Sequence, residues 1–226
     1  MRVLVIIPAY NEEECLAGTV DSFVKECPQF DYLVVNDGSK DSTGDIIAKN
    51  GYAGVNLPIN TGLTSAFRTG MKYAHRNGYD AAIQFDADGQ HIPTFIAPMV
   101  EAMEREHADV VIASRLVNGG KLGGMRGVGS TMISGLIKLT SGVRITDPTS
   151  GMRLYSARMI RNFAKDFDYA PEPDTIALAA RQKYAIVEVP VTMQDRQGGE
   201  SYLKLSAIVK YMARTILSIV LFQWFR

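Results

Sequence analysis

Short apolar runs alternate with longer amphipathic segments through the first half of the chain. The apolar runs are rich in β-branched residues, which is typical of strands buried on both faces of a parallel sheet. They span residues 2–7, 31–35, 81–85 and 109–113. The segments between them place apolar residues at helical spacing, and they span 12–26, 41–50, 62–77 and 93–106. This alternation predicts an α/β fold with a doubly wound, mostly parallel sheet flanked by helices.

The second half of the chain has a less regular pattern. Residues 114–130 are rich in glycine and lack a period, and a loop of that length is usually functional or disordered. Beyond it, the spacing predicts three helices and then one strand, at 128–140, 156–165, 174–182 and 185–189. The last segment, 202–226, mixes apolar residues with lysine, arginine and terminal aromatic residues, which predicts an amphipathic helix.

The composition excludes several classes of protein. The 226 residues are 46% apolar, enough to bury a large core without a disulfide or metal. Basic and acidic residues are equal in number, at 24 each, so nucleic acid is not an expected partner. Cys15 and Cys27 are too few for a zinc cluster or a disulfide framework. The first apolar run is short and is followed by Glu12, Glu13 and Glu14, unlike a secretory signal, so a cytoplasmic location is expected.

Acidic side chains follow two of the predicted strands, at the edge where open α/β sheets bind ligands. Asp86 and Asp88 come directly after a buried strand, and Gln90 adds an amide oxygen. Such oxygen ligands are suited to a hard divalent cation. Asp37 follows a neighbouring strand, although a simple turn is the alternative for it. Together these residues favour one site shared by a metal ion and a nucleotide.

The end of the first strand differs from a dinucleotide-binding turn. Such a turn is rich in glycine and seats a pyrophosphate at a helix N-terminus. Here three glutamates occupy the expected first turn and would repel a phosphate. A nicotinamide or flavin cofactor is therefore not expected, whereas Tyr10 and Glu12 are placed to face a nucleoside.

Arginines lie on both sides of the glycine-rich loop. Arg115 follows the strand at 109–113, and Arg126 and Ser130 are four residues apart at a helix start, so both face one anion. A lone surface arginine is usually only solvated. Here Arg153 and Arg196 bring the number of arginines in the second half's candidate site to four, which favours an anion site.

Three segments together resemble the family-2 glycosyltransferases of the GT-A fold: Ile7–Glu12, Asn36–Ser39 with Asp41 and Thr43, and Asp86–His91. The resemblance implies a metal-dependent, inverting hexosyltransferase that uses a UDP- or GDP-linked sugar. It implies that the base, ribose and nucleotide are lined by Pro8, Tyr10, Glu12, Asp37 and Asp86. It further implies that Asp86, Asp88 and Gln90 hold Mg²⁺ or Mn²⁺ on the diphosphate. Asp88 is then part of the catalytic centre.

The second half resembles dolichol-phosphate mannosyltransferases and bacterial relatives that glycosylate polyprenyl phosphates, through Thr146–Tyr155, 188–191, 195–196 and 199–201. This resemblance implies transfer of a hexose or N-acetylhexosamine to an undecaprenyl-type phosphate. The residues expected to hold the acceptor phosphate are Arg115, Arg126, Ser130, Arg153 and Arg196.

Three further acidic residues are expected at the catalytic site. Asp147 is expected to organise the acceptor arginines. Glu172 and Asp174 fall near the acceptor, and one of them would act as a base if the acceptor were a sugar hydroxyl. For Asp174, capping of the helix at 175–182 is the alternative.

The expected organisation is a glycosyltransferase domain over 1–201, with a nucleotide-sugar half at 1–113 and an acceptor half at 114–201, and a helix at 202–226. Because 215–225 is almost entirely apolar, this helix is expected to attach the enzyme peripherally to the inner face of the cell membrane. Packing on its own domain, an integral membrane partner and a homo-oligomer are the alternatives. Two other functions remain open: a family-2 enzyme that extends a cell-surface polysaccharide, and a non-catalytic nucleotide-binding scaffold.

Overall fold

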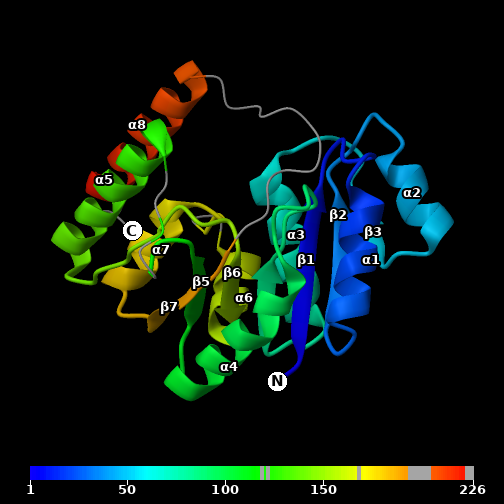
Figure 1. The fold of residues 1–226 in the computed structure, drawn as a ribbon, viewed down its shortest axis with the longest axis horizontal. Coiled ribbons are helices and arrows are strands. Elements are labelled where there is room, and N and C mark those ends of the chain that lie inside the picture. Colours follow the sequence, from blue (N-terminus) through cyan, green and yellow to red (C-terminus); the bar gives the residue numbers. More distant parts are fainter. Residues whose placement is uncertain (118–119, 121–122, 167–168, 193–204, 222–226) are drawn as a thin grey trace.

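A seven-stranded sheet forms the centre of the computed structural model, which describes residues 1–117, 120, 123–166, 169–192 and 205–221 (Figure 1). Within those residues the strand order is β3-β2-β1-β4-β6-β5-β7. The strands are β1 (Val3–Ala9), β2 (Asp31–Asn36), β3 (Gly54–Asn56), β4 (Ala81–Gln84), β5 (Val110–Ser114), β6 (Arg153–Ser156) and β7 (Ile186–Pro190).

The predicted mostly parallel sheet is confirmed. β1 pairs in parallel with β2 and β4, and the β2–β3 and β5–β7 pairs are also parallel. β6 is antiparallel to both of its neighbours, β4 and β5. The sequence pattern missed β3 because it has three residues, and β6 because a buried arginine opens its four residues.

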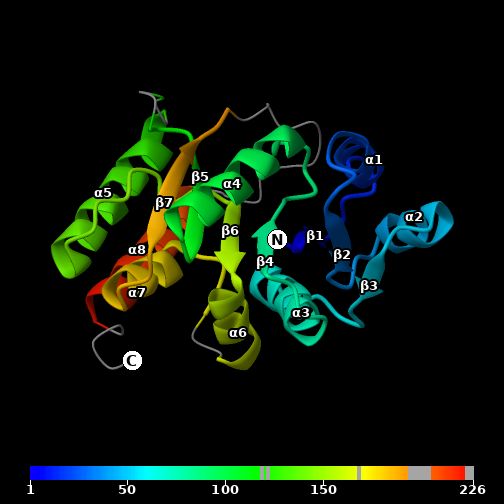
Figure 2. The ribbon, with the colours of Figure 1, turned by 90° about the horizontal axis from the view of Figure 1, so that it is seen from below.

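Helices cover both faces of this sheet. They are α1 (Leu16–Glu26), α2 (Thr43–Asn50), α3 (Leu63–Arg76), α4 (Ile96–Glu106), α5 (Gly124–Ser141), α6 (Ala157–Lys165), α7 (Pro173–Arg181) and α8 (Leu205–Val220), with a 3₁₀ turn at Pro93–Phe95. Figure 2 shows α3, α6 and α7 on one face and α1 and α4 on the other. No helix in the described part of the chain has the length and apolar character needed to cross a membrane.

Two apolar cores separate the sheet from these helix layers. Leu4 and Ile6 of β1 enter the core beneath α3 and α6, and Val5 and Ile7 enter the core beneath α1 and α4. Successive side chains of a strand point to opposite faces, so a strand covered on both faces is apolar throughout. Gly70 of α3 allows close packing, because a Cβ there would collide with Ile6.

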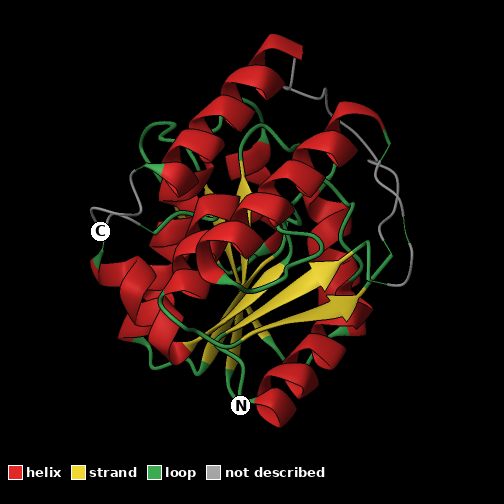
Figure 3. Cartoon of the chain, turned by 90° about the vertical axis from the view of Figure 1, so that its left-hand side faces the viewer, coloured by secondary structure: helices red, strands yellow, loops and turns green. Residues whose placement is uncertain are grey.

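The C-terminal helix α8 packs beside α5 and α7, on the side of the molecule that faces the viewer in Figure 3. Ile219 is buried, and the Ser218 hydroxyl donates to Asp174 Oδ2 at 2.8 Å. Leu217 and Leu221 are exposed. One side of the described part of α8 is therefore occupied by its own domain, an alternative that the sequence left open, and the other side faces solvent.

Candidate active site

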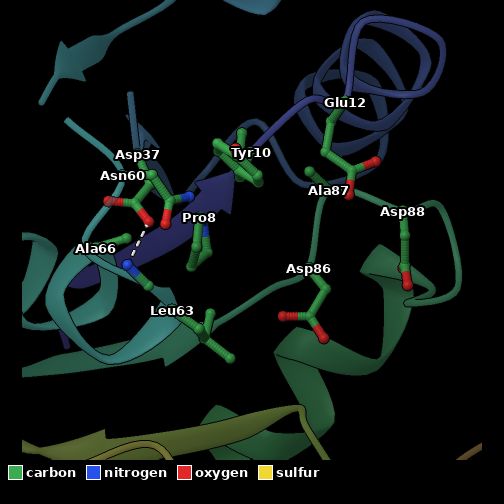
Figure 4. A pocket seen from close by; sticks show the side chains of 12 residues that line it. Pro8, Tyr10, Glu12, Asp37, Asn60, Leu63, Ala66, Asp86, Ala87 and Asp88 are labelled. Atoms are coloured by element: carbon green, nitrogen blue, oxygen red, sulfur yellow. Dashed lines mark hydrogen bonds between the residues drawn. The ribbon is translucent and has the colours of Figure 1, made fainter. Parts of the chain in front are cut away.

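A cavity of about 410 Å³ opens at the carboxyl ends of β1, β2 and β4 (Figure 4). Small-molecule sites have volumes of roughly 300–1,000 Å³. The cavity brings together the residues predicted to bind the donor and two of the three predicted metal ligands, Asp86 and Asp88: Pro8, Tyr10, Glu12, Asp37, Asp86 and Asp88. Asn60, Leu63 and Ala66 also line it. Sequence reasoning missed these three, which belong to a loop and helix start without a distinctive motif.

Asp37 fixes one wall of the cavity. It is 2% exposed, and its Oδ1 accepts hydrogen bonds from the Thr61 N–H at 2.9 Å and the Thr61 hydroxyl at 3.0 Å. Its Oδ2 accepts from the Gly62 N–H at 2.7 Å. Gly38 makes this approach possible, because its φ is +64° and a Cβ would collide with the backbone of Ile59. Both oxygens of Asp37 thus hold the loop before α3, and contact with a nucleoside stays a prediction.

Glu12 is placed by the segment that joins β2 to the start of α2. The Glu12 N–H donates to Thr43 Oγ1 at 2.9 Å, and the neighbouring Asn11 N–H donates to Ser39 Oγ at 3.0 Å. The helix predicted from residue 12 begins instead at Leu16. That prediction was wrong at its start, since residues 12–15 form a turn in which the N–H groups of Cys15 and Leu16 both donate to the Glu12 carbonyl.

The charged groups that line the cavity are all carboxylates: Glu12, Asp37, Asp86 and Asp88. Figure 4 shows Glu12, Asp86 and Asp88 gathered on one side. A diphosphate would be repelled from such a surface unless a cation neutralised it. Among the described residues, no three His, Cys, Asp or Glu side chains are arranged to hold a metal alone. Mg²⁺ commonly takes one or two carboxylates and completes its shell with phosphate oxygens and water, so these residues fit a divalent cation bound with a nucleotide.

Gln90 contributes to this loop through its backbone. Its N–H donates to Asp88 Oδ1 at 3.1 Å, and its side chain is partly exposed. It is not among the residues that line the cavity. Gln90 as a metal ligand therefore stays a prediction, while its hydrogen bond orients Asp88.

A buried ion pair organises the second half of the site. Asp147 is 0% exposed, and Arg115 donates to it from Nε at 2.7 Å and from Nη2 at 2.8 Å. Glu188 of β7 accepts from the N–H groups of Thr146 at 2.7 Å and Asp147 at 2.8 Å. Burial would raise the pKa of Asp147, but the hydrogen bonds and charge of Arg115 hold that pKa below its ordinary value.

Thr149 connects this pair to Ser130. Arg115 Nη2 donates to Thr149 Oγ1 at 3.2 Å, and Thr149 Oγ1 lies 3.1 Å from Asp147 Oδ1 and 3.2 Å from Ser130 Oγ. The structure therefore brings together two of the predicted acceptor residues. Sequence reasoning assigned no role to Thr149 or Glu188, because a threonine in a turn and a glutamate within a strand have no distinctive spacing.

Of the other predicted acceptor arginines, the structure describes the side chain of Arg153 but not those of Arg126 and Arg196. Arg153 is 2% exposed and donates to the Pro148 carbonyl at 2.9 Å, so it supports the turn that carries Asp147. Arg126 lies in the first turns of α5, and its side chain is outside the described residues, as is all of Arg196. Phosphate binding by these arginines stays a prediction.

Glu172 and Asp174 lie at the start of α7. Glu172 is the N-cap residue, and Asp174 is in the first turn. Asp174 Oδ1 accepts from the Thr175 N–H at 2.9 Å, while Oδ2 accepts from Ser218 of α8. This arrangement favours a structural role for Asp174, and the predicted catalytic role of both residues stays a prediction.

Comparisons with known proteins agree with this architecture. Residues 4–163 match the family described as Glycosyl transferase family 2. The undecaprenyl-phosphate mannosyltransferase of Micrococcus luteus is 36% identical over 215 residues, which cover 89% of this chain and 87% of that protein. The polyprenol monophosphomannose synthase of Mycolicibacterium smegmatis is 32% identical over 224 residues, which cover 93% and 84%.

Among solved structures, the chain is similar to glucosyl-3-phosphoglycerate synthase from Mycobacterium tuberculosis in complex with Mn²⁺, uridine diphosphate and phosphoglyceric acid. The TM-score is 0.75 at 18% identity, with 97% of this chain and 77% of that chain covered. This likeness confirms the predicted GT-A fold. The chain therefore belongs to glycosyltransferase family 2.

Proposed function

We propose that this glycosyltransferase transfers a hexose or N-acetylhexosamine from a nucleotide sugar to a polyprenyl phosphate at the cytoplasmic face of the membrane, with inversion and with a divalent metal. The observation that carries the proposal is the turn at 147–151, which joins the two candidate sites. Thr149 at its middle contacts Arg115. At its end, a Cβ built on Gly151 would lie 3.0 Å from Asp86 Oδ2. The Arg115–Asp147 ion pair and the carboxylate cavity are therefore neighbours.

The relatives support the same acceptor and donor chemistry. The two bacterial relatives are named for mannosyl transfer to undecaprenyl phosphate and for polyprenol monophosphomannose synthesis. The similar solved structure contains Mn²⁺ with uridine diphosphate. The proposed metal ligands are Asp86, Asp88 and Gln90.

On the donor side, Pro8 and Tyr10 offer a surface for the base and ribose, and Asp86 and Asp88 lie toward the diphosphate. A bound Mg²⁺ or Mn²⁺ would neutralise the diphosphate and stabilise it as a leaving group. Asp37 holds the opposite wall through Thr61 and Gly62.

On the acceptor side, a polyprenyl phosphate is already an anion at neutral pH and needs no strong general base. Its oxygen forms the new bond to the anomeric carbon as the bond to the nucleotide diphosphate breaks, and the leaving diphosphate keeps the electron pair. Arg115, whose side chain is 25% exposed, would seat the phosphate together with Ser130, to which it is connected through Thr149. A sugar hydroxyl would need a base; Asp174 has both carboxylate oxygens engaged, which leaves Glu172 as the candidate for that role.

The proposal predicts that radiolabelled sugar enters the organic phase only when the lipid carries a phosphate. The purified protein would be incubated with a panel of UDP- and GDP-sugars, Mn²⁺, and either undecaprenyl phosphate or undecaprenol. Transfer to undecaprenyl phosphate is expected, with none to undecaprenol and none after EDTA treatment. Label that enters only a water-soluble glycan would establish the polysaccharide alternative.

We further propose that α5 joins α8 in contacting the lipid surface. Val128, Met132 and Leu139 of α5 recur at helical spacing and are 62%, 51% and 82% exposed. Leu217 of the adjacent α8 and Leu221, directly after its end, are about half exposed. Exposed Lys138 and Arg214 accompany these residues. Apolar stripes flanked by cations are suited to the surface of an anionic bilayer.

Replacing Leu139 and Leu217 together by glutamate is expected to abolish sedimentation with liposomes that contain anionic phospholipid. Each fully buried leucine contributes about 1.5–3 kcal/mol to attachment, so the combined loss is at least roughly 100-fold. Val24→Glu, at an equally apolar exposed position on α1, is the matched control and should sediment like the wild type. The lipid contact would be contradicted if the wild-type protein did not sediment with the liposomes at low salt or at high salt.

A further inference from the structure

The Asp86 carboxylate is held by side chains on two sides. Gln84 Nε2 donates to Asp86 Oδ1 at 3.0 Å. His91 Nε2 lies 3.7 Å from Asp86 Oδ2, and His91 Nδ1 accepts from the Asp86 backbone N–H at 2.9 Å. Asp86 is thus hydrogen-bonded at its backbone N–H and at Oδ1, while Oδ2 lies close to the His91 ring.

His91 is fixed in one orientation. It is 6% exposed, and its ring packs edge-on against Phe85 with centroids 5.4 Å apart. Because Nδ1 accepts the Asp86 N–H, the proton of the neutral imidazole is on Nε2. That N–H is on the side of the ring nearest Asp86 Oδ2. One imidazole therefore holds the path of the loop and lies beside the carboxylate.

Gln84 is a polar residue in an otherwise apolar strand. It ends β4 and is 2% exposed. Its Oε1 has no hydrogen-bond partner among the residues that the structure describes. An unsatisfied buried oxygen destabilises a fold. The Nε2 end of the amide gives the reason for a glutamine at this position: a carboxylate only accepts hydrogen bonds, and Nε2 donates one to Asp86.

Gly151 leaves room for the carboxylate. A Cβ there would lie 3.0 Å from Asp86 Oδ2 and 3.7 Å from His91 Nε2. Its φ lies outside the left-handed region, so the backbone itself does not require glycine. The space beside Asp86 is therefore the reason for a glycine at this position.

We propose that Gln84, His91 and Gly151 are positioning residues that orient Asp86 toward the divalent cation bound with the nucleotide. The inference rests on the proposed metal-dependent donor site and deepens it. Side chains that orient a metal ligand typically affect metal affinity 10- to 100-fold when they are replaced.

Gln84→Met is the sharpest test, because it keeps the length of the side chain and removes both polar ends. Calorimetric titration with UDP and with GDP, each with and without Mn²⁺, would measure the metal-dependent part of nucleotide affinity. We expect that part to fall roughly 10- to 100-fold, while the melting temperature of the apo protein stays equal or rises. A purely structural role for Gln84 predicts a lower melting temperature and unchanged metal dependence.

Gly151→Ala and two substitutions of His91 complete the test. Gly151→Ala should weaken only the metal-dependent part of nucleotide affinity. Gly18→Ala, where a Cβ meets nothing within 4 Å, should leave that affinity unchanged. His91→Asn keeps an acceptor near the place of Nδ1 and should retain more metal-dependent affinity than His91→Ala.

The outcomes separate this inference from the proposed function. If Mn²⁺ strengthens nucleotide binding in the wild type but equally in the Gln84, His91 and Gly151 variants, the positioning role is overturned and the metal site stands. If Mn²⁺ does not strengthen binding of either nucleotide to the wild type, the proposed metal site fails, and the positioning role fails with it.

Discussion

Asp88→Asn is expected to abolish sugar transfer and the Mn²⁺-dependent part of nucleotide binding while the protein remains folded. Asp88 lines the cavity beside Asp86, and the substitution removes one negative charge from a site that lacks cationic lining residues among those described. The asparagine oxygen can still accept the Gln90 N–H, so the loop keeps its hydrogen bond. A loss of several kcal/mol of transition-state stabilisation corresponds to a roughly thousandfold lower kcat/KM.

Calorimetry with nucleotide and Mn²⁺, together with the lipid-extraction assay, measures both effects. Asp45→Asn is the matched control, because Asp45 is exposed on α2 and the change of charge is identical. The assignment of Asp88 to the metal would be refuted by a variant that keeps wild-type metal-dependent affinity.

Arg115→Met is expected to lower the free energy of unfolding by about 3–5 kcal/mol at neutral pH, because it leaves the fully buried Asp147 carboxylate without its cation. It is also expected to lower kcat/KM for the lipid phosphate, with little change in nucleotide affinity. Asp147→Asn in the Arg115→Met background should recover part of the lost stability, since the uncompensated charge is then absent. Urea unfolding of the two single variants and the double variant measures this coupling.

The same pair predicts a pH dependence. The pKa of Asp147 in the folded protein is below its ordinary value of 3.8, so the ionised carboxylate stabilises the fold fully above that value. The contribution is lost as the pH falls through the lowered pKa. In Arg115→Met, burial without the cation raises the pKa, so the stability deficit relative to the wild type should shrink as the pH falls. A deficit that stays constant down to about pH 3 would contradict the buried-charge explanation.

The sequence determined the nucleotide side of the fold and its candidate site. Unbroken apolar runs identified β1, β2, β4 and β5, because strands covered on both faces must be apolar throughout. The predicted donor residues lie at or just after the ends of three of these strands. Since the carboxyl ends of parallel strands meet at one edge, chain order alone predicted that Tyr10, Asp37 and Asp86 would come together.

The tertiary structure decided the contacts between residues far apart in the chain. Asp37 is engaged by Thr61, 24 residues later, and Glu188 holds the turn of Asp147, 41 residues earlier. Ser218 of α8 donates to Asp174, 44 residues earlier, and so docks a helix whose sequence alone favoured a lipid surface. The local spacing of apolar and polar residues cannot predict such pairs, because each depends on how distant elements pack. The sequence therefore predicted which groups lie at the site, and only the packing decided which of them position others and which remain accessible to a ligand.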